Sequence, residues 1–294
     1  MPTYDASVKK ALPSQKDLSD PEHCSADPEK LATVGRAPKH QVRIKRNSSE
    51  YGLYTVSDVR PESPDNIVRM GPTGLKRLGT SGEFAAILDS QVAHPTYNDV
   101  TAKDRSEFVE RLEDNGTGLV VIAPHGGGIE PHTDEQAEHV ASRLVAKAAS
   151  LWRCKGWWRH RQGDAFDHWH ITSTEINEAS FPRLNSIISR GFAYAVAFHG
   201  FHKSEILIGG GCAAESLKQE IKTEIERAIA GSGIRVRIAS SDERYGGDSP
   251  LNIVNRLTAD GESGIQIEQS LQARSSHWRQ KIADAVADVY DRKL

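Results

Sequence analysis

The amino-acid sequence predicts an α/β fold built around an open sheet, and three segments of its second half carry that prediction. Residues 118–124 (GLVVIAP) and 193–200 (AYAVAFHG) are nearly continuous apolar runs, as expected for strands buried on both faces of a sheet. Between them, residues 133–136 (TDEQ) form a capping box that predicts a helix reaching about Ser150. Strands that alternate with helices in this way are typical of an α/β sheet.

The rest of the second half continues the alternation of helices and strands. The helix expected over about 213–230 follows a glycine-rich turn and ends at Gly231. Residues 234–239 and 264–270 are predicted as two further strands. Ser276 is expected to cap a closing amphipathic helix.

Composition divides the chain into three predicted parts. Residues 1–38 are polar, contain several prolines and lack sustained periodicity, so we expect a flexible tail. Residues 39–115 combine strand-like segments with apolar stretches broken by glycine. They are predicted to be an accessory region that packs on the main domain or covers its cleft. Residues 116–294 carry the α/β pattern and the candidate chemistry.

The overall composition indicates a soluble globular protein. Of its 294 residues, 37% are hydrophobic and 26% are charged, and no run of apolar residues is long enough to span a membrane. The net charge of −3 argues against a general nucleic-acid-binding protein. The chain starts without the apolar stretch of a secretory signal, and its three cysteines are widely spaced, so a cytoplasmic location is expected, although export by another route stays open. Nothing in the sequence specifies an oligomeric state.

Side chains that can bind a metal ion lie at the ends of the expected strands. His125 ends the first strand, His199 ends the second, and Glu130 follows His125 in a loop whose glycines allow a tight reversal. Because ligands bind at the carboxyl ends of the strands in open α/β sheets, these side chains are expected to converge. Two histidines and one carboxylate, with a fourth position left to water, are the ligand set of a catalytic zinc site.

Glu268 is the candidate general base of such a site. In residues 265–268 (IQIE) the isoleucines share one face of the strand, which leaves Gln266 and Glu268 on the other. Hydrolysis at zinc needs a carboxylate outside the metal shell that takes the proton of water and passes it to the leaving amine. A carboxylate at the end of an apolar strand is unfavourable without such a task or a partner. An ion pair with Arg274 is the structural alternative.

The loop at residues 125–128 (HGGG) admits a second chemical interpretation. It is also compatible with the oxyanion-hole loop of an esterase, which requires a Gly-x-Ser-x-Gly nucleophile elbow that the sequence lacks. Taken singly, His125 could be an ordinary hydrogen-bonded histidine and Glu130 a solvated loop acid. The metal-site prediction therefore depends on the whole set of residues.

An ordered set of short motifs resembles the poly-gamma-glutamate hydrolase family of phages and bacilli. The motifs are PHGGGIEPHTDEQA, WHITST, AFHGF, IGGG, LNIVNR and GIQIEQSLQAR, within about residues 116–294. The resemblance implies a three-layer open mixed sheet with helices on both faces, as in zinc carboxypeptidases, with the preceding residues as an N-terminal extension. It also implies one zinc ion per chain bound by His125, Glu130 and His199, with Glu268 as the catalytic base. The N-terminal part departs from the family pattern, which leaves the substrate open.

The expected function is a zinc-dependent hydrolase of gamma-glutamyl amide substrates, polymeric or small. Arg256 and Arg274 are the candidates for binding substrate carboxylates, because a guanidinium group pairs with a carboxylate in a bidentate manner. Structural roles for both arginines are the alternative. Two other functions stay open: a zinc amidase for small N-acyl amino acids, and a non-catalytic polyanion-binding protein that uses the basic, aromatic stretch 152–161.

Overall fold

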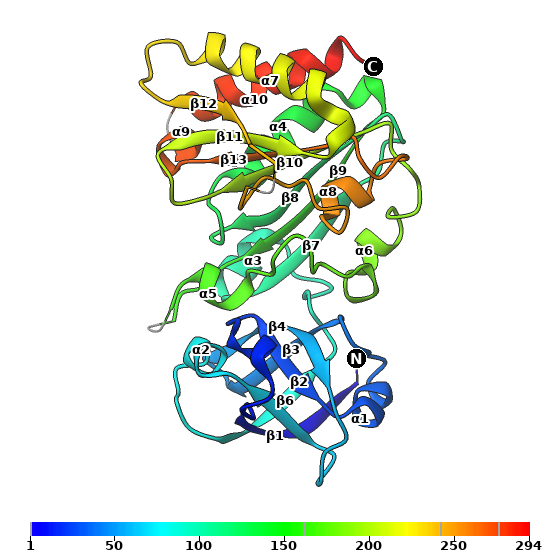
Figure 1. Cartoon of the computed structure of the whole chain (residues 1–294), viewed down its shortest axis with the longest axis vertical. Coiled ribbons are helices and arrows are strands. Elements are labelled where there is room, and N and C mark those ends of the chain that lie inside the picture. The colour runs from blue at the N-terminus through cyan, green and yellow to red at the C-terminus, as the bar shows by residue number, and fades with distance from the viewer. Residues whose placement is uncertain (1, 161–162, 242, 276) are drawn as a thin grey trace. The chain divides into compact units, whose positions relative to one another are not determined.

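The computed structural model describes residues 2–160, 163–241, 243–275 and 277–294. Ser276, the expected helix cap, and Arg161, in the basic and aromatic stretch, lie outside the described residues. The chain divides into two compact units (Figure 1). Unit 1 comprises Met1–Val109 and Gly156–Pro182, and unit 2 comprises Glu110–Lys155 and Arg183–Leu294.

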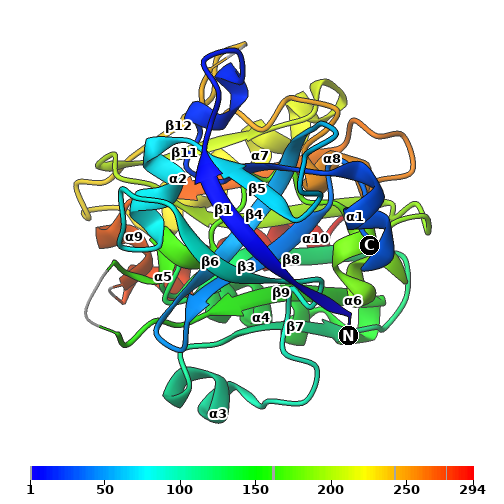
Figure 2. The same cartoon turned by 90° about the horizontal axis from the view of Figure 1, so that it is seen from below.

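Unit 1 is built on a closed barrel (Figure 2), which among the described residues has the strand order β1-β5-β2-β4-β3-β6. Its strands are β1 (Thr3–Lys10), β2 (His23–Ala26), β3 (Gln41–Asn47), β4 (Glu50–Val59), β5 (Ile67–Met70) and β6 (Phe84–Asp89). Pairing is mixed, since β1 runs parallel to β5 and antiparallel to β6. The apolar interior includes the fully buried Val8, Ile44 and Met70. Closure pairs the edges of the sheet with each other, so that this interior is sealed by backbone hydrogen bonds.

Short helices complete unit 1. They are η1 (Lys16–Ser19), α1 (Pro28–Thr33), α2 (Pro72–Arg77), α3 (Asp99–Asp104), α5 (Ala165–Trp169) and η3 (Glu178–Ser180). The carboxylate of Asp27 caps α1 by accepting from two backbone N–H groups of its first turn, and Pro28 starts the helix with its fixed φ. A reciprocal capping box between Asp164 and Asp167 fixes the start of α5. Local side-chain signals therefore define where these short helices begin.

Unit 2 is built on a mixed sheet, in which the described strands follow the order β12-β11-β13-β10-β8-β9-β7. Its strands are β7 (Phe108–Glu113), β8 (Leu119–Gly127), β9 (Ala149–Gly156), β10 (Tyr194–Gly200), β11 (Glu205–Gly210), β12 (Arg235–Ile238) and β13 (Gly264–Gln269). The central strands β8, β10 and β13 are parallel, whereas β11 runs antiparallel to β13. The carboxyl ends of β8, β10 and β13 therefore meet at one edge of the sheet.

The longest described helices of unit 2 pack together against one face of this sheet (Figure 1). They are α4 (Thr133–Arg143), α7 (Glu215–Ala228) and α10 (Trp278–Asp291); the shorter elements are η2 (Val145–Lys147), α6 (Pro182–Asn185), η4 (Cys212–Ala214), α8 (Ile253–Arg256) and α9 (Leu271–Ser275). In α7 the buried Leu217, Ile221 and Ile225 recur every four residues and form the apolar stripe that faces the sheet. In the described part of the chain, no helix has both the length and the apolar character to cross a membrane.

The fold class predicted from the sequence is wrong. The N-terminal part, expected as an extension, forms a closed barrel. The chain as a whole therefore combines a barrel with a mixed sheet and is not a three-layer, carboxypeptidase-like sheet. Residues 1–38, expected as a flexible tail, contribute β1 and β2 to the barrel. The signal in β1 is weak because only alternate residues face the interior, so that Tyr4, Ala6 and Val8 are separated by polar side chains. The boundary expected at 115/116 also differs, because residues 156–182 belong to unit 1.

Candidate metal centre

Side chains predicted to carry the chemistry lie at the carboxyl ends of neighbouring strands in unit 2. His125 lies near the end of β8 and His199 near the end of β10, which pair in parallel. Glu268 lies near the end of β13 and is the direct Cα partner of His199 across the sheet. The parallel pairing of the three strands thus places these residues at one edge, as the apolar runs in the sequence predicted.

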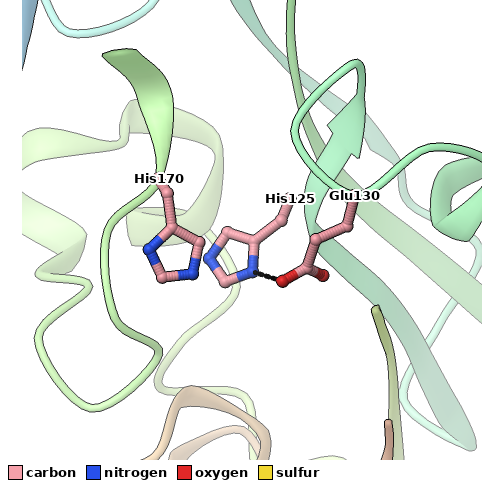
Figure 3. A group of neighbouring side chains, drawn as sticks. All are labelled: His125, Glu130 and His170. Atoms are coloured by element: carbon pink, nitrogen blue, oxygen red, sulfur yellow. Dashed lines mark hydrogen bonds and ion pairs between the residues drawn. The ribbon is translucent and has the colours of Figure 1, made fainter. Parts of the chain in front are cut away.

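The potential ligand atoms of His125, Glu130 and His199 lie close together, with a different carboxylate oxygen of Glu130 next to each histidine. Nδ1 of His125 is 3.2 Å from Oε1 of Glu130 (Figure 3) and 3.2 Å from Nδ1 of His199. Oε2 of Glu130 is 3.3 Å from Nδ1 of His199. Ligands about 2.1 Å from a tetrahedral zinc ion lie about 3.4 Å from each other, so this spacing fits one such ion.

These three side chains are buried, with exposed fractions of 3% for His125, 5% for Glu130 and 2% for His199. Imidazole nitrogen and carboxylate oxygen are the zinc ligands common in catalytic sites, so the donor set suits this metal as well as the spacing does. His170, which Figure 3 also labels, belongs to unit 1, where its Nδ1 contacts the carboxylate of Glu22.

A tight turn between β8 and α4 brings Glu130 back to His125. The backbone N–H of Glu130 donates to the carbonyl of His125 at 2.8 Å and closes the turn. Gly127 adopts a φ of +72°, which residues with a side chain rarely take. A Cβ at Gly126 would lie 2.5 Å from the Cβ of Asp134, so only glycine fits there. Close packing therefore requires glycine at 126, and the backbone conformation favours it at 127.

Glu130 is held in its charged form. Burial alone would raise the pKa of its carboxyl group, but the neighbouring His125 and His199 outweigh that effect and lower the pKa well below its ordinary value. Its Oε2 also accepts a hydrogen bond from the backbone N–H of Gly200 at 2.9 Å. The anionic carboxylate is the form that binds a metal ion.

Glu268 lies in a different electrostatic environment from Glu130. Burial raises the pKa of its carboxyl group well above the ordinary value, and the negative charge of Glu130 raises it further. Its Oε1 accepts a hydrogen bond from Nε2 of Gln266 at 3.0 Å. Two nearby carboxyl groups with pKa values displaced in opposite directions are typical of acid–base chemistry.

Arg274 lies beside this edge of the sheet, in α9. Its Nη1 donates to the carbonyl of Pro131 at 2.7 Å, and its guanidinium packs so closely on Gly200 that a Cβ there would be 2.4 Å from Nε. Its positive charge lowers the pKa of the Glu268 carboxyl group, but among the described residues no direct ion pair joins the two side chains. Arg256 is half-buried at the end of α8, and its assignment to substrate binding stays a prediction.

A buried ion pair that the sequence analysis missed supports the turn between His125 and Glu130. Nζ of Lys155 lies 2.9 Å from Oδ2 of Asp134, and Oδ1 of Asp134 accepts from the backbone N–H of Gly127 at 3.1 Å. Both side chains are less than a tenth exposed. The available signal was a lysine at the end of an apolar strand, because such a buried charge needs a partner.

The first half of the basic and aromatic stretch 152–161 is a buried part of β9. Trp152 is fully buried and donates from Nε1 to Glu110 at 2.9 Å. Arg153 forms ion pairs with Glu113 and Glu138, each at 2.6 Å. Arg153 and Lys155, the cationic residues of this strand, thus have carboxylate partners within unit 2, and the polyanion-binding alternative for the stretch as a whole stays a prediction.

Comparison with known proteins gives the family of the chain. Residues 95–288 match the family model described as poly-gamma-glutamate hydrolase. This chain belongs to the poly-gamma-glutamate hydrolase family. The resemblance inferred from the short motifs is thereby confirmed, and the family indicates a hydrolase.

Relatives of this hydrolase-family chain align with about two thirds of it. The SPbeta prophage-derived UPF0714 protein YoqZ of Bacillus subtilis (strain 168) is 27% identical over an alignment of 214 residues, which covers 68% of this chain and 70% of that protein. The zinc-free form of YndL is similar with a TM-score of 0.50 at 23% identity, over 64% of this chain and 91% of that structure. A bacteriophage poly-gamma-glutamate hydrolase aligns over 68% of this chain and 98% of its own, with 23% identity and a TM-score of 0.49. The likeness to YndL concerns the fold.

Proposed function

We propose that this chain is a zinc-dependent hydrolase that cleaves gamma-glutamyl amide bonds. The observation that carries the proposal lies at the carboxyl edge of the sheet, where Nδ1 of His125 and Nδ1 of His199 are 3.2 Å apart and each lies 3.2–3.3 Å from an oxygen of Glu130. Membership of the poly-gamma-glutamate hydrolase family supports the substrate class. Zinc is supported by this ligand set and by YndL, whose solved structure is described as zinc-free.

His125, Glu130 and His199 would hold the zinc ion. When bound, zinc supplies Lewis acidity to a water molecule and to the amide carbonyl of the substrate. The protein's part is to keep the ligands in place and to hold Glu130 as an anion, which the neighbouring histidines favour by lowering the pKa of its carboxyl group. The buried surroundings keep bulk water from competing for these side chains.

Glu268 is the proposed general base and then general acid. Its carboxylate takes a proton from the attacking water as the C–O bond forms at the amide carbon. The same proton then passes to the amine nitrogen as the C–N bond breaks, which leaves Glu268 ionised again. The raised pKa of its carboxyl group suits a residue that must hold this proton between the two steps.

Arg274 is the proposed partner for a carboxylate of the substrate. Gamma-glutamyl compounds carry a free carboxylate beside the scissile chain, and a guanidinium binds it with two parallel hydrogen bonds. Arg274 is buried beside Gly200, and its Nε has no hydrogen-bond partner among the described residues. Arg256 is the second candidate for the same role.

The test is cleavage of poly-gamma-glutamate by the zinc-loaded protein, followed as chain shortening by gel filtration. We expect the polymer to shorten, and Glu268→Gln to slow this reaction by a factor of about 10² to 10⁴ while zinc stays bound. Glu262→Gln is the matched control, because Glu262 is an exposed acid on the loop before β13. Full activity of Glu268→Gln would contradict the mechanism. If the protein cleaves small N-acyl amino acids and leaves the polymer intact, it is instead an amidase for small substrates.

A further inference from the structure

We propose that Asn252 and Gln266 form an amide relay that positions Glu268 for proton transfer. The relay connects a backbone N–H of α8 to the carboxylate of Glu268 through two side-chain amides. Neither amide belongs to the ligand set or contacts it through a described hydrogen bond. The inference rests on the proposed role of Glu268, and it concerns what makes that carboxylate effective.

The direction of each hydrogen bond in the relay is fixed from its outer end. The backbone N–H of Val254 can only donate, and it donates to Oδ1 of Asn252 at 3.1 Å. Nδ2 of Asn252 therefore points the other way and donates to Oε1 of Gln266 at 2.8 Å. With Oε1 used as an acceptor, Nε2 of Gln266 is left to donate to Oε1 of Glu268 at 3.0 Å.

A second backbone group fixes the same orientation of Gln266. Its Nε2 also donates to the carbonyl of Tyr245 at 3.1 Å, and a carbonyl can only accept. A flipped amide would set the oxygen of Gln266 against the carbonyl of Tyr245 and the carboxylate of Glu268. Both protons of Nε2 are thus committed, which is the arrangement expected of a polar network that specifies one conformation.

Close packing confines the relay. Asn252 and Gln266 are each only 4% exposed, so water has little access to replace their hydrogen bonds. The loop over Gln266 passes so near that a Cβ at Gly247 would lie 2.8 Å from the Cβ of Gln266. Gly247 itself has a φ of +69°, a conformation that favours glycine. The side chain of Gln266 is therefore held in one position by its surroundings as well as by its hydrogen bonds.

The consequence for Glu268 is that its two oxygens differ. Oε1 is occupied as an acceptor by Gln266, while Oε2 accepts no hydrogen bond from the described residues. The relay thereby prevents rotation of the carboxylate and leaves Oε2 as the oxygen that exchanges the proton. Orientation of a reacting group contributes strongly to rate, so loss of the relay should lower kcat rather than substrate binding.

The structure offers a matched control on the same strand. Gln269 is also buried in β13, and its amide exchanges two hydrogen bonds of 2.9 Å with the amide of Gln136. Gln269→Leu therefore breaks a buried glutamine network of comparable size next to Glu268 in sequence. It does not remove a hydrogen bond of the Glu268 carboxylate, so it reports the purely structural effect of such a change.

The experiment compares Gln266→Leu, Asn252→Asp and Gln269→Leu by kcat and KM on a gamma-glutamyl oligomer, zinc content and thermal unfolding. We expect Gln266→Leu to lower kcat about 10-fold to 100-fold with KM within about two-fold and zinc retained. Asn252→Asp keeps the acceptor for Val254 but loses the donor to Gln266, and should lower kcat about five-fold or more. The double variant should be no slower than Gln266→Leu, because both changes interrupt one path.

Equal kcat values for Gln266→Leu and Gln269→Leu would overturn the proposal. If Gln266→Leu does not fold, Asn252→Asp decides alone, and wild-type kcat in that variant would contradict the relay. Failure of the relay is distinguishable from failure of the proposed function. If Glu268→Gln is inactive and Gln266→Leu is fully active, only the relay is contradicted. If Glu268→Gln is active, the role of Glu268 as the base is contradicted.

Discussion

Buried charged side chains occur in both units, and their surroundings differ. In unit 1, Arg43 is buried against Glu107, with guanidinium-to-carboxylate distances of 2.9–3.0 Å, donates to the carbonyl of Val92 and lies over the ring of Trp169. In unit 2, the carboxyl edge of the sheet gathers two histidines around Glu130, and the pKa of the nearby Glu268 carboxyl is raised partly by the charge of Glu130.

This difference distinguishes buried charged groups that stabilise the fold from buried charged groups that serve a function. An ion pair such as Arg43–Glu107 combines opposite charges and ordinary hydrogen bonds, so it is complete without any other molecule. The cluster at the edge of the unit 2 sheet combines two imidazoles with two carboxyl groups, and the negative charge of Glu130 opposes ionisation of Glu268. Arrangements of the second kind are found at sites that bind ions or perform acid–base chemistry.

The largest effect is expected from breaking the ion pair of unit 1. Glu107→Ala would leave the guanidinium of Arg43 buried without its carboxylate, which should lower the free energy of unfolding by about 3 kcal/mol or more. Chemical denaturation measures this change. Zinc affinity of the folded variant should equal that of the wild type, and a weakened zinc affinity would show that the ion pair also serves the metal centre.

A smaller effect, confined to the metal centre, is expected from the ion pair behind the turn of unit 2. Lys155→Met leaves Asp134 without its cation, and Asp134 holds the backbone of Gly127 near the candidate ligand His125. Changes to groups that support metal ligands weaken metal binding about 10-fold to 100-fold, and competition with a chromophoric chelator would measure this.

Arg153→Met is the matched control for Lys155→Met. Arg153 lies two residues earlier in β9 and pairs with Glu138, four residues after Asp134 in α4, and with Glu113. Its loss should lower stability without changing zinc affinity, because no described hydrogen bond joins these groups to the turn. Equal zinc affinities in the two variants would mean that Asp134 and Lys155 serve only stability.

The smallest effect concerns pH and unit 1. The carboxylate of Glu175, 2.7 Å from Nε2 of His23, outweighs the opposing effect of burial and raises the pKa of His23 to about 9. The folded pKa lies above the ordinary value of 6.5, so this stabilisation is complete below about pH 6.5 and is lost as pH rises through 9. His23→Gln should therefore lower the free energy of unfolding by about 1–2 kcal/mol at pH 6 and by less at pH 9.5. A difference independent of pH would contradict this assignment.

The candidate site was more accessible to sequence reasoning than the fold around it. His125 and His199 follow long apolar runs, and Glu268 alternates with isoleucines, so a local pattern places each of them at a strand end. The barrel depends instead on pairing between distant segments, such as Ser7 with Ile67, which no local pattern reveals. The predicted division of the chain into three consecutive regions differs from the two observed units for the same reason.

The contacts of the side chains that support the candidate site could not be predicted from the sequence either. Gln266 was recognised as sharing a face with Glu268, but its donor Asn252 lies directly before α8 and its acceptor Tyr245 in a preceding loop. Lys155 and Asp134 meet only because β9 lies beside β8 in the sheet and α4 packs on it. Periodicity and motif spacing report on strand ends, whereas these hydrogen bonds require the folded chain.

Metal content tests the central claim most directly. Inductively coupled plasma mass spectrometry on the purified, zinc-supplied protein would compare the wild type with His125→Ala, Glu130→Ala and His199→Ala. His139→Ala is the control, because His139 lies on α4 and pairs with Asp284 instead. We predict about one zinc ion per chain in the wild type and the control, and its loss in the three ligand variants. A well-folded wild type without zinc, or ligand variants that retain it, would contradict the account.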